Sequence, residues 1–496
     1  MHAAAQGSGS DARHPLPSAH PVEAERWRAA FRPAARAPRP GPRRVGVIGG
    51  GMLGLTLALR LRQQGHDVTV LEAAPDVGGL AASHALGGWP CDRFYHVVLP
   101  ADTVLQALLA ELGVADRLRW RTTRTGFYTG GRLLSMSSAL DFVAFRPLGP
   151  LDKARLAYTI LRAARVRDWR RLEAIPVADW LRRLSGRRTF ERIWLPLLRS
   201  KLGENYRHTS ATFIWATIAR LYGARGAGAK RERFGWLDGG YAAVLARYAA
   251  HLRAAGVDVR CGASVAGVWD HGAGGEGDGP GGVDVRLTSG ETLAFDAVAL
   301  TLPTGRVAAL APQLADAERA RLRGVTYQGI VCAAVLLKRP PAGGYYVTNI
   351  TDDGLPFTAV IDMTALVDPA AVGGHALVYL PRYVAQDDPL WQASDAQVAE
   401  RFLAGLWRIH PHLGPDDVVD VRVSRAREVL ALTTLHYSER HLPPVRTSLP
   451  NVFVVTSAQI AAGTLNVNES LQVAEAGARA MGEALGAAAG ARGAAA

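Results

Sequence analysis

The sequence predicts an α/β protein of two or three domains that begins with a parallel sheet. Three observations predict this class. First, the chain has 496 residues, of which 48% are hydrophobic, and this is enough to bury a core in more than one domain. Second, strand patterns at 45–48 and 67–72 flank a helical pattern, which is the order of a βαβ unit. Third, helical spacing dominates 102–119 and about 151–225, whereas the later half of the chain has mainly strand patterns. These strand patterns lie at 257–269, 283–287, 293–301, 329–338, 345–350, 357–362, 375–380 and 452–456.

The net charge of +13 is confined to two parts of the chain. Residues 1–44 hold eight arginines and three acids, and 152–201 hold fourteen basic residues and five acids. The remainder is close to neutral. Because no motif of a known nucleic-acid-binding fold accompanies the basic residues, we expect no nucleic-acid partner.

The cysteines and the apolar runs bear on the location of the protein. Cys91, Cys261 and Cys332 are far apart and form no CxxC pair, so we expect neither a disulfide framework nor a metal site. The chain has no apolar run of about 18 residues and no signal-peptide core, which predicts a cytoplasmic protein without a transmembrane segment. Residues 1–43 and 486–496 are predicted to be disordered tails, because their composition cannot form a core.

A glycine-rich turn joins the first strand to the first helix. Gly49, Gly51 and Gly54 have the GxGxxG spacing: the first allows a tight turn, the second lets a pyrophosphate approach the backbone, and the third lets the helix pack closely. The helix that begins at Met52 adds unpaired N–H groups for an anion. Glu72, at the end of the second strand, can accept hydrogen bonds from both ribose hydroxyls. Together these features predict a dinucleotide site.

The residues after Glu72 favour one dinucleotide. The run from Glu72 to Leu80 contains a second glycine pair, Gly78 and Gly79, for which a simple NAD-binding unit has no use. This arrangement resembles the glutathione-reductase-type FAD fold, in particular the flavin amine oxidase, protoporphyrinogen oxidase and phytoene desaturase superfamily. The resemblance implies FAD as the cofactor, with Gly78 and Gly79 along its pyrophosphate and ribityl chain.

The resemblance also implies two interleaved domains. One is an FAD-binding Rossmann domain, and the other is an α+β substrate domain made of a mixed sheet and a helical lobe. We expect the FAD-binding domain to comprise 44–98, 230–305 and 445–485, and the substrate-binding domain to comprise 99–229 and 306–444.

Later stretches resemble the same superfamily. Residues 89–96 are similar to its DxxxH segment near the flavin ring, and 295–303 are similar to the strand that closes its FAD domain. Residues 235–240 and the helix after them resemble the return into that domain, where the backbone of Val265 is implied to contact adenine.

The C-terminal part has the superfamily's strand and helix start with one substitution. The superfamily has a strand, then an acid on the ribityl chain, then a glycine-led helix start under the flavin. Here Ser457 stands near the expected acid, and Gly463, Thr464 and Leu465 stand at the helix start. The Ser457 hydroxyl could accept the same hydrogen bond without charge, so FAD binding is still expected.

Two residues are candidates for catalysis beside the flavin. His96 could donate or accept a proton, because the pKa of imidazole is close to neutrality; a structural, hydrogen-bonded histidine is the alternative. Cys332 falls where many amine oxidases have a lysine near flavin N5, which argues against a plain amine oxidase. The alternative for Cys332 is a small core hydrophobe.

Substrate contacts are expected from the basic segment and from one tyrosine. Arg187, Arg188, Arg199 and Lys201 could hold carboxylate or phosphate groups, although solvated helix faces would have the same composition. Tyr346 lies beside a strand that could face the flavin, although aromatic side chains in strands usually belong to a core.

These features predict an FAD-dependent oxidoreductase that removes hydride from a small organic substrate, anionic or lipophilic, by an amine-oxidation or desaturation type of reaction. O₂ or a quinone would reoxidise the flavin. One alternative is a non-redox isomerase that resembles UDP-galactopyranose mutase, in which the arginines would bind a diphosphate. A redox-inert FAD-binding scaffold is a further alternative. The basic segment could also contact acidic lipid at a membrane surface.

Overall fold

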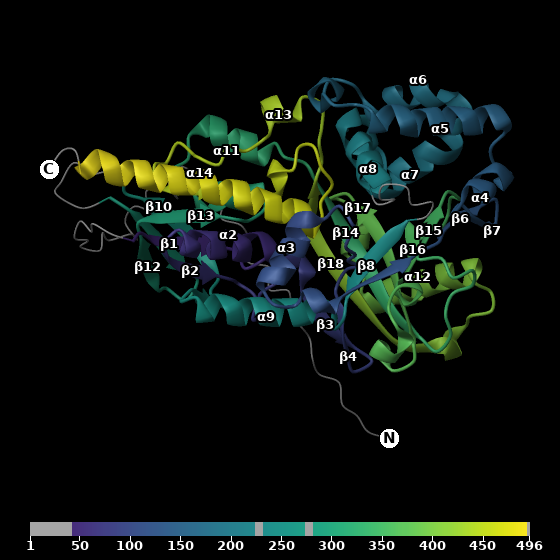
Figure 1. Cartoon of the computed structure of the whole chain (residues 1–496), viewed down its shortest axis with the longest axis horizontal. Coiled ribbons are helices and arrows are strands. Elements are labelled where there is room, and N and C mark those ends of the chain that lie inside the picture. Colours follow the sequence, from purple (N-terminus) through teal and green to yellow (C-terminus); the bar gives the residue numbers. More distant parts are fainter. Residues whose placement is uncertain (1–41, 224–231, 273–280, 494–496) are drawn as a thin grey trace.

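The computed structural model of the chain describes residues 42–223, 232–272 and 281–493. The predicted tail at 1–43 lies outside the described residues except for its last two positions, and so does the middle of the glycine-rich stretch at 270–282. Two halves lie side by side along the long axis of the molecule (Figure 1). One half contains a parallel sheet, and the other contains a mixed sheet with a lobe of helices above it.

The first half is built on a five-stranded parallel sheet with the order β19-β13-β1-β2-β9. Its strands are β1 Arg44–Ile48, β2 Asp67–Leu71, β9 Asp258–Arg260, β13 Ala297–Leu300 and β19 Val452–Val454. Residues 45–48 of β1 are buried, as expected for a central strand that is covered on both faces. The predicted βαβ unit therefore forms the centre of this sheet.

Helices cover one face of the parallel sheet, and a small antiparallel sheet covers the other. The helices are α2 Met52–Gln63, α3 Thr103–Glu111, α9 Gly240–Ala254 and α14 Val467–Gly493. The opposite layer consists of β10 Val265–Asp270, β11 Val283–Leu287, β12 Thr292–Phe295 and α10 Thr304–Leu310. Val45 and Val47 belong to the core under the helices, and Ile48 belongs to the core under the antiparallel strands. The sheet is thus the middle of three layers.

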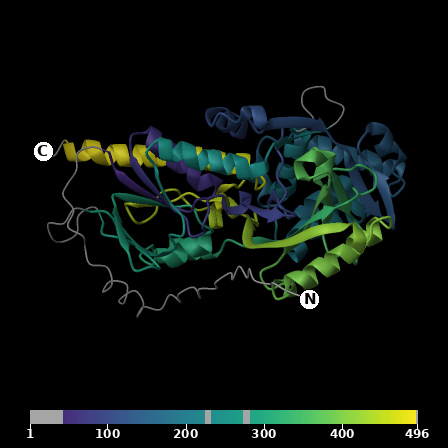
Figure 2. The same cartoon turned by 90° about the horizontal axis from the view of Figure 1, so that it is seen from below.

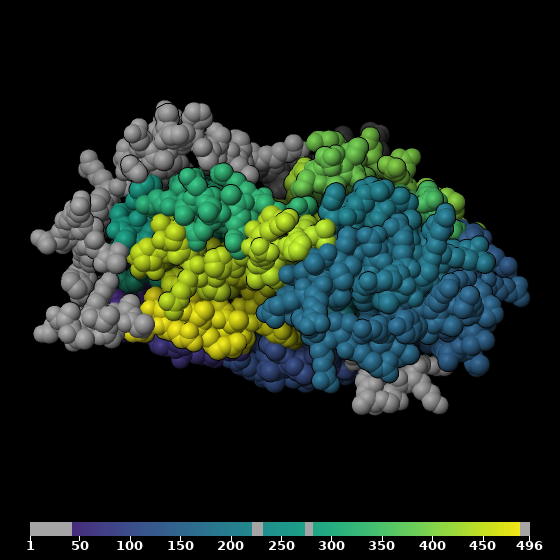
Figure 3. All heavy atoms as spheres, turned by 90° about the horizontal axis from the view of Figure 1, so that it is seen from above, coloured from purple at the N-terminus to yellow at the C-terminus, as the bar shows by residue number. Residues whose placement is uncertain are grey.

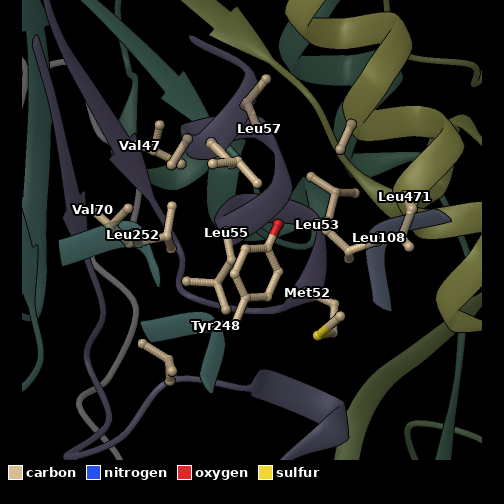
Figure 4. Packing of buried hydrophobic residues seen from close by; sticks show 14 of the residues in the cluster. Val47, Met52, Leu53, Leu55, Leu57, Val70, Leu108, Tyr248, Leu252 and Leu471 are labelled. Carbon is tan, nitrogen blue, oxygen red and sulfur yellow. The ribbon is translucent and has the colours of Figure 1, made fainter. Parts of the chain in front are cut away.

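The core between α2 and α9 is centred on a buried tyrosine. Figure 4 shows Tyr248 of α9 beside Leu55 of α2 and near Val70 of the sheet. The Tyr248 hydroxyl donates a hydrogen bond of 2.9 Å to Thr56 Oγ1, and Thr56 donates one of 2.8 Å to the Met52 carbonyl. Both buried hydroxyls are therefore satisfied inside an otherwise apolar core.

Helix α14 extends further than the sequence predicts. It continues to Gly493, beyond Leu485, whereas a disordered tail was expected from 486 onward. Four of the eight residues from Gly486 to Gly493 are alanine, which has the highest helix propensity, and three are glycine.

The second half is built on a seven-stranded sheet with the order β18-β14-β17-β16-β15-β6-β7. Neighbouring strands are antiparallel except β15 and β6, which are parallel, so the sheet is mixed as predicted. The strands are β6 Thr125–Thr129, β7 Arg132–Ser135, β14 Tyr327–Leu337, β15 Val347–Ile350, β16 Ala359–Asp362, β17 Ala376–Val384 and β18 Val418–Ala431. Every residue of β14 is buried, and alternate side chains enter two different cores.

Helix α12 (Asp395–Ile409) packs against one of these cores, and a helical lobe lies on the other side of the sheet (Figures 1 and 2). The lobe consists of α4 Ala139–Ala144, α5 Pro150–Ala164, α6 Val177–Thr189, α7 Leu195–Leu202 and α8 Ala211–Gly223. Helix α7 contacts β15 and β17. No helix among the described residues has both the length and the apolar content that crossing a bilayer requires.

Two short ribbons run between the halves. Strand β3 (Ser83–Leu86) pairs with β4 (Trp89–Asp92), and β5 (Leu118–Thr122) pairs with β8 (Arg233–Leu237). The helix predicted over 102–119 is therefore wrong after Glu111. Gly113 has a φ of 71°, a left-handed conformation that ends α3 and turns the chain toward β5.

Candidate functional site

The GxGxxG turn leaves room for a ligand at one of its three glycines. A Cβ atom on Gly54 would lie 1.9 Å from the Gly49 carbonyl oxygen, so α2 can approach the turn only with glycine there. A Cβ atom on Gly51 would have Gly79 Cα, 3.9 Å away, as its nearest neighbour. The space above Gly51 is therefore open, at the point where the motif places a pyrophosphate.

The second glycine pair lies directly against this turn. The Gly78 N–H donates a hydrogen bond of 2.8 Å to the Gly50 carbonyl, and Gly78 has a φ of 135°. A Cβ atom on Gly79 would lie 3.2 Å from Gly51 Cα. The two glycine segments thus form one backbone-lined cradle, which fits the extended phosphate-containing part of a dinucleotide.

Glu72 is fixed by the same turn. Its Oε2 accepts a hydrogen bond of 2.6 Å from the Gly50 N–H, and its Oε1 accepts one of 2.8 Å from the Ala74 N–H. Because a carboxylate has about four lone-pair positions, both oxygens retain capacity for ribose hydroxyls. The Ala263 N–H donates to the Glu72 carbonyl at 2.8 Å, which brings the chain that leads to Val265 beside Glu72. The residues present therefore fit an adenosine end at this edge of the sheet.

At the other end, three predicted flavin contacts share one small cavity. Ser457, Gly463 and Leu465 line it together with residues of the helical lobe and of the end of β18. The full lining consists of Phe213, Leu430, Ala431, Thr433, Ser457, Ile460, Gly463 and Leu465. Thr464 lies between two lining residues, and its carbonyl accepts a hydrogen bond of 2.6 Å from Asn466 Nδ2.

The cavity is largely apolar and its lining includes no charged side chain. Its polar lining groups include the Thr433 hydroxyl, which is buried and has no hydrogen-bond partner among the described residues. Ser210 and Thr212 also have buried hydroxyls without a described partner, and the Ser210 N–H donates to the Thr433 carbonyl at 2.9 Å. Unpaired buried hydroxyls beside an apolar cavity are groups that a ligand could satisfy. Phe213 and Thr433 belong to no motif, so the sequence did not predict them as site residues.

His96 lies beside Asp92 at the start of α9. Its Nδ1 is buried, lies 3.6 Å from Asp92 Oδ2 and has no hydrogen-bond partner among the described residues. Its ring centroid lies 5.0 Å from that of Tyr241. Asp92 Oδ1 accepts a hydrogen bond of 3.0 Å from the Tyr241 N–H near the first turn of α9. The DxxxH spacing therefore joins a helix-capping acid to a partly exposed imidazole.

Cys332 and Tyr346 belong to one packed core rather than to the cavity lining. Cys332 is fully buried on β14 and shares this core with Phe94 and Tyr379. Burial raises the pKa of the Cys332 thiol and that of the Tyr346 phenol well above their ordinary values. Both groups are therefore neutral at physiological pH, which favours the core interpretation of Cys332.

Lys201 is the one predicted substrate cation that lies against the sheet. Its Nζ lies 5.0 Å from the centroid of the Tyr383 ring on β17. The Tyr383 and Tyr95 hydroxyls are 3.3 Å apart. Tyr95 directly precedes His96, so these contacts link the helical lobe to the predicted near-flavin segment. Neither tyrosine was singled out from the sequence, because their contact depends on segments far apart in the chain.

The three predicted arginines lie on solvent-facing parts of the lobe. Arg187 pairs with Glu191 at 2.7 Å, Arg188 with Asp152 at 3.4 Å and Arg199 with Glu204 at 3.1 Å. The Arg187 side chain is 87% exposed. The arrangement does not bring these arginines together with the cavity, and it matches the solvated-face interpretation of this segment.

Similarity to known proteins agrees with this geometry. Coproporphyrinogen III oxidase of Mycobacterium bovis is 32% identical over 228 residues, which are 41% of this chain and 50% of that protein. This chain thus matches half the length of that curated relative. The structure described as "putative protoporphyrinogen oxidase" from Exiguobacterium sp. 255-15 superposes with a TM-score of 0.69 at 19% identity, over 89% of this chain and 98% of the other. Putrescine oxidase bound to putrescine superposes with a TM-score of 0.64 at 18% identity, over 89% and 99% of the two chains.

These structural matches confirm the predicted fold class, and the sequence matches confirm the resemblance to the oxidase superfamily and the FAD cofactor that it implies. The profile that matches most of the chain, residues 53–480, is described as flavin containing amine oxidoreductase. With the glycine cradle, the Glu72 contacts and this match in agreement, the chain belongs to the family of flavin-containing amine oxidoreductases.

Proposed function

We propose that the protein is an FAD-dependent oxidoreductase that oxidises a small, lipophilic substrate at a carbon next to nitrogen or to conjugated unsaturation. The observation that supports this best is the apolar wall of Phe213, Leu430 and Leu465 beside the predicted flavin contacts Ser457 and Gly463. An apolar lining without charge favours a neutral, apolar part of a substrate, because an unpaired ion there would lose its hydration.

The residues that would hold FAD follow from the cradle. Gly49, Gly51 and Gly54, with Met52 at the start of α2, would face the pyrophosphate, and Gly78 and Gly79 would extend this contact. The other proposed contacts are Glu72 at the ribose, Val265 at the adenine, and Ser457, Gly463, Thr464 and Leu465 at the flavin end. When bound, FAD supplies a two-electron acceptor, which O₂ or a quinone would regenerate.

The chain itself would orient the substrate, exclude water and move a proton. The apolar wall formed by Phe213 and Leu430 excludes water, and the unpaired Thr433 hydroxyl is free to position a polar atom of the substrate. We assign proton transfer to His96, whose Nδ1 has no described hydrogen-bond partner and lies near the Asp92 carboxylate. Cys332 would serve as packing behind this site.

A non-redox isomerase comparable to UDP-galactopyranose mutase is the second candidate, and the arrangement of charge counts against it. A diphosphate substrate needs cations in the cavity, whereas Arg187 and Arg188 are paired on the exterior of the lobe. Lys201 is the predicted cation with the best position for substrate contact, and it would contribute a single charge.

Anaerobic reduction of the flavin tests the proposal. Purified holoprotein is mixed without oxygen with benzylamine, putrescine or coproporphyrinogen III, and flavin absorbance is followed. Bleaching of the flavin by the uncharged form of benzylamine supports oxidation of an apolar substrate. Bleaching only by the anionic tetrapyrrole would contradict the lipophilic assignment, and conversion of a UDP-sugar without bleaching would favour the isomerase.

A matched pair of variants tests the cavity. Leu430→Asp puts a carboxylate in the apolar wall, and we expect reduction by a neutral substrate to slow by about tenfold or more while bound FAD stays stoichiometric. Leu430→Met keeps the wall apolar and should react like the native protein. Equal rates for Leu430→Asp and Leu430→Met would exclude this cavity as the substrate site.

A further inference from the structure

Exposed apolar side chains gather on one part of the helical lobe. Seven large hydrophobic residues are exposed among the described residues, and five of them lie on α4 and α5. Their exposed fractions are 82% for Leu140, 69% for Val143, 63% for Leu151, 55% for Tyr158 and 42% for Leu161. We call these five residues the α4–α5 patch.

Helix α4 is held at the surface although it is mostly apolar. None of its residues is buried. Its N-terminus is fixed by a capping box between Ser138 and Asp141, and Lys153 of α5 donates to the Val143 carbonyl. The exposure of Leu140 and Val143 is thus a property of an anchored helix and not of a loose end.

Helix α5 has apolar side chains on two opposite faces. Leu156 and Ala163 point into the core of the lobe, together with Thr159. Leu151 and Tyr158 are seven residues apart, so they lie on one line along the opposite, outward face, and Leu161 lies beside them. A helix on the surface of a globular protein normally presents a polar outward face. The outward face of α5 therefore has the composition of a face that is covered by something apolar.

Arginines surround the α4–α5 patch. Those that are exposed and have no ion pair among the described residues are Arg146, Arg155, Arg162, Arg165 and Arg167. The acids within residues 139–167 are Asp141 and Asp152, of which Asp141 is bonded to Ser135 and Asp152 is buried. The patch therefore combines exposed apolar groups with uncompensated positive charge.

We propose that the α4–α5 patch binds the surface of an anionic lipid membrane. The apolar side chains would enter the boundary between headgroups and acyl chains, and the arginines would contact the phosphates and acidic headgroups. A second copy of this chain fits less well, because an isologous contact would set arginine against arginine. A nucleic acid would match the charge but would leave Leu140, Leu151 and Leu161 without an apolar partner.

The position of the patch suits this contact. The lobe forms the outer surface at the end of the molecule away from the parallel sheet (Figure 3). Helix α5 also packs on α8, from which Phe213 reaches the cavity wall. The inference does not depend on the proposed reaction, because it rests only on the exposed side chains of the lobe.

Vesicle co-sedimentation of the full-length holoprotein tests the proposal. The probes are phosphatidylcholine vesicles with and without phosphatidylserine, at low and high salt. We expect binding that needs phosphatidylserine and weakens with salt. Leu151→Ser/Tyr158→Ser/Leu161→Ser and Arg162→Glu/Arg165→Glu should each weaken it by more than about tenfold. FAD content serves as the measure of folding.

Two variants outside the α4–α5 patch control for the change in charge and for the loss of exposed apolar surface. Arg323→Glu/Arg401→Glu makes the same charge change at exposed residues of other helices, and Val419→Ser removes an exposed apolar side chain on β18. Both should bind vesicles like the native protein. Equal binding by the patch variants and the native protein would overturn the proposal and assign any lipid contact to another basic part of the chain. Binding to duplex DNA but not to vesicles would overturn it in favour of a nucleic acid.

Discussion

The ammonium group of Lys201 lies 5.0 Å from the centroid of the Tyr383 ring, and this contact joins the helical lobe to the mixed sheet. Lys201 belongs to α7, and Tyr383 belongs to β17. The Tyr383 hydroxyl in turn lies 3.3 Å from that of Tyr95. Burial, followed by the neighbouring Tyr383, raises the pKa of Tyr95 well above its ordinary value, so this phenol stays protonated and available as a donor.

We expect a measurable coupling between Lys201 and Tyr383. A partly buried cation over an aromatic face contributes about 1 kcal/mol, so a double-mutant cycle with Lys201→Met and Tyr383→Leu should give a coupling of that size in the free energy of unfolding. Denaturant unfolding of the four proteins measures it. Strict additivity would mean that the contact contributes nothing, and Tyr383→Phe, which keeps the ring, should retain most of the coupling with Lys201.

Substitutions at two glycines of the GxGxxG motif should have different effects, one on folding and the other on FAD binding. A Cβ atom on Gly54 meets the Gly49 carbonyl oxygen at 1.9 Å, so Gly54→Ala should prevent stable folding. A Cβ atom on Gly51 would make only an ordinary van der Waals contact, with Gly79 Cα at 3.9 Å, and the φ of Gly51 is −73°, so Gly51→Ala should fold but lose FAD. Circular dichroism and the ratio of flavin to protein absorbance separate the two results. Full flavin occupancy in Gly51→Ala would refute the placement of the pyrophosphate.

His96 and Asp92 should have separable roles. His96→Ala should retain FAD but slow anaerobic flavin reduction by about 10²-fold, which is the usual scale for a lost acid–base group. Asp92→Ala should instead lower the free energy of unfolding by about 1 kcal/mol, because the Tyr241 N–H in the first turn of α9 loses its acceptor. Cys332→Ala serves as the control and should change neither rate nor FAD content. If Cys332→Ala were slow and His96→Ala fast, the catalytic group would lie on β14.

Asp362 predicts a pH dependence of stability. Burial raises the pKa of this carboxyl to about 6, from an ordinary value near 3.8. Between these pH values the unfolded chain releases the proton while the folded protein keeps it. The contribution of Asp362 to the free energy of unfolding is therefore fully present below about pH 4 and is lost as the pH rises through 6. The loss amounts to about 3 kcal/mol. Asp362→Asn should remove it and stabilise the protein at pH 7. The exposed Asp353→Asn is the control, and a pH profile of Asp362→Asn that matches the native one would contradict the assignment.

Local sequence patterns determined the nucleotide half of the fold. Strand β1, the turn at Gly49–Gly51, helix α2 and strand β2 form one continuous segment of the chain, in which β1 pairs with β2. The bond from the Gly50 N–H to Glu72 is an example, because the spacing of the motif alone brings the two together. This is why a dinucleotide site could be predicted from the motif, whereas FAD was implied by the resemblance to the oxidase superfamily.

The second sheet could be predicted only in part. Strands β14 to β17 were expected, whereas β6, β7 and β18 (Val418–Ala431) were not. The valines of β18 alternate with charged residues such as Arg422, and this strand lies at the edge of the sheet. Alternation of this kind indicates a half-buried strand, whereas a continuous apolar run indicates a strand that is buried on both faces.

Tertiary structure alone decided which residues meet at the proposed substrate site. Phe213, Leu430 and Ser457 come from three distant segments, and the cavity exists only where these segments converge. The same applies to the basic segment, in which Lys201 turns toward Tyr383 while Arg187 faces solvent. Spacing along one helix places side chains on a face, but only the neighbours that pack against that face decide whether a cation meets an aromatic ring, an acid or water.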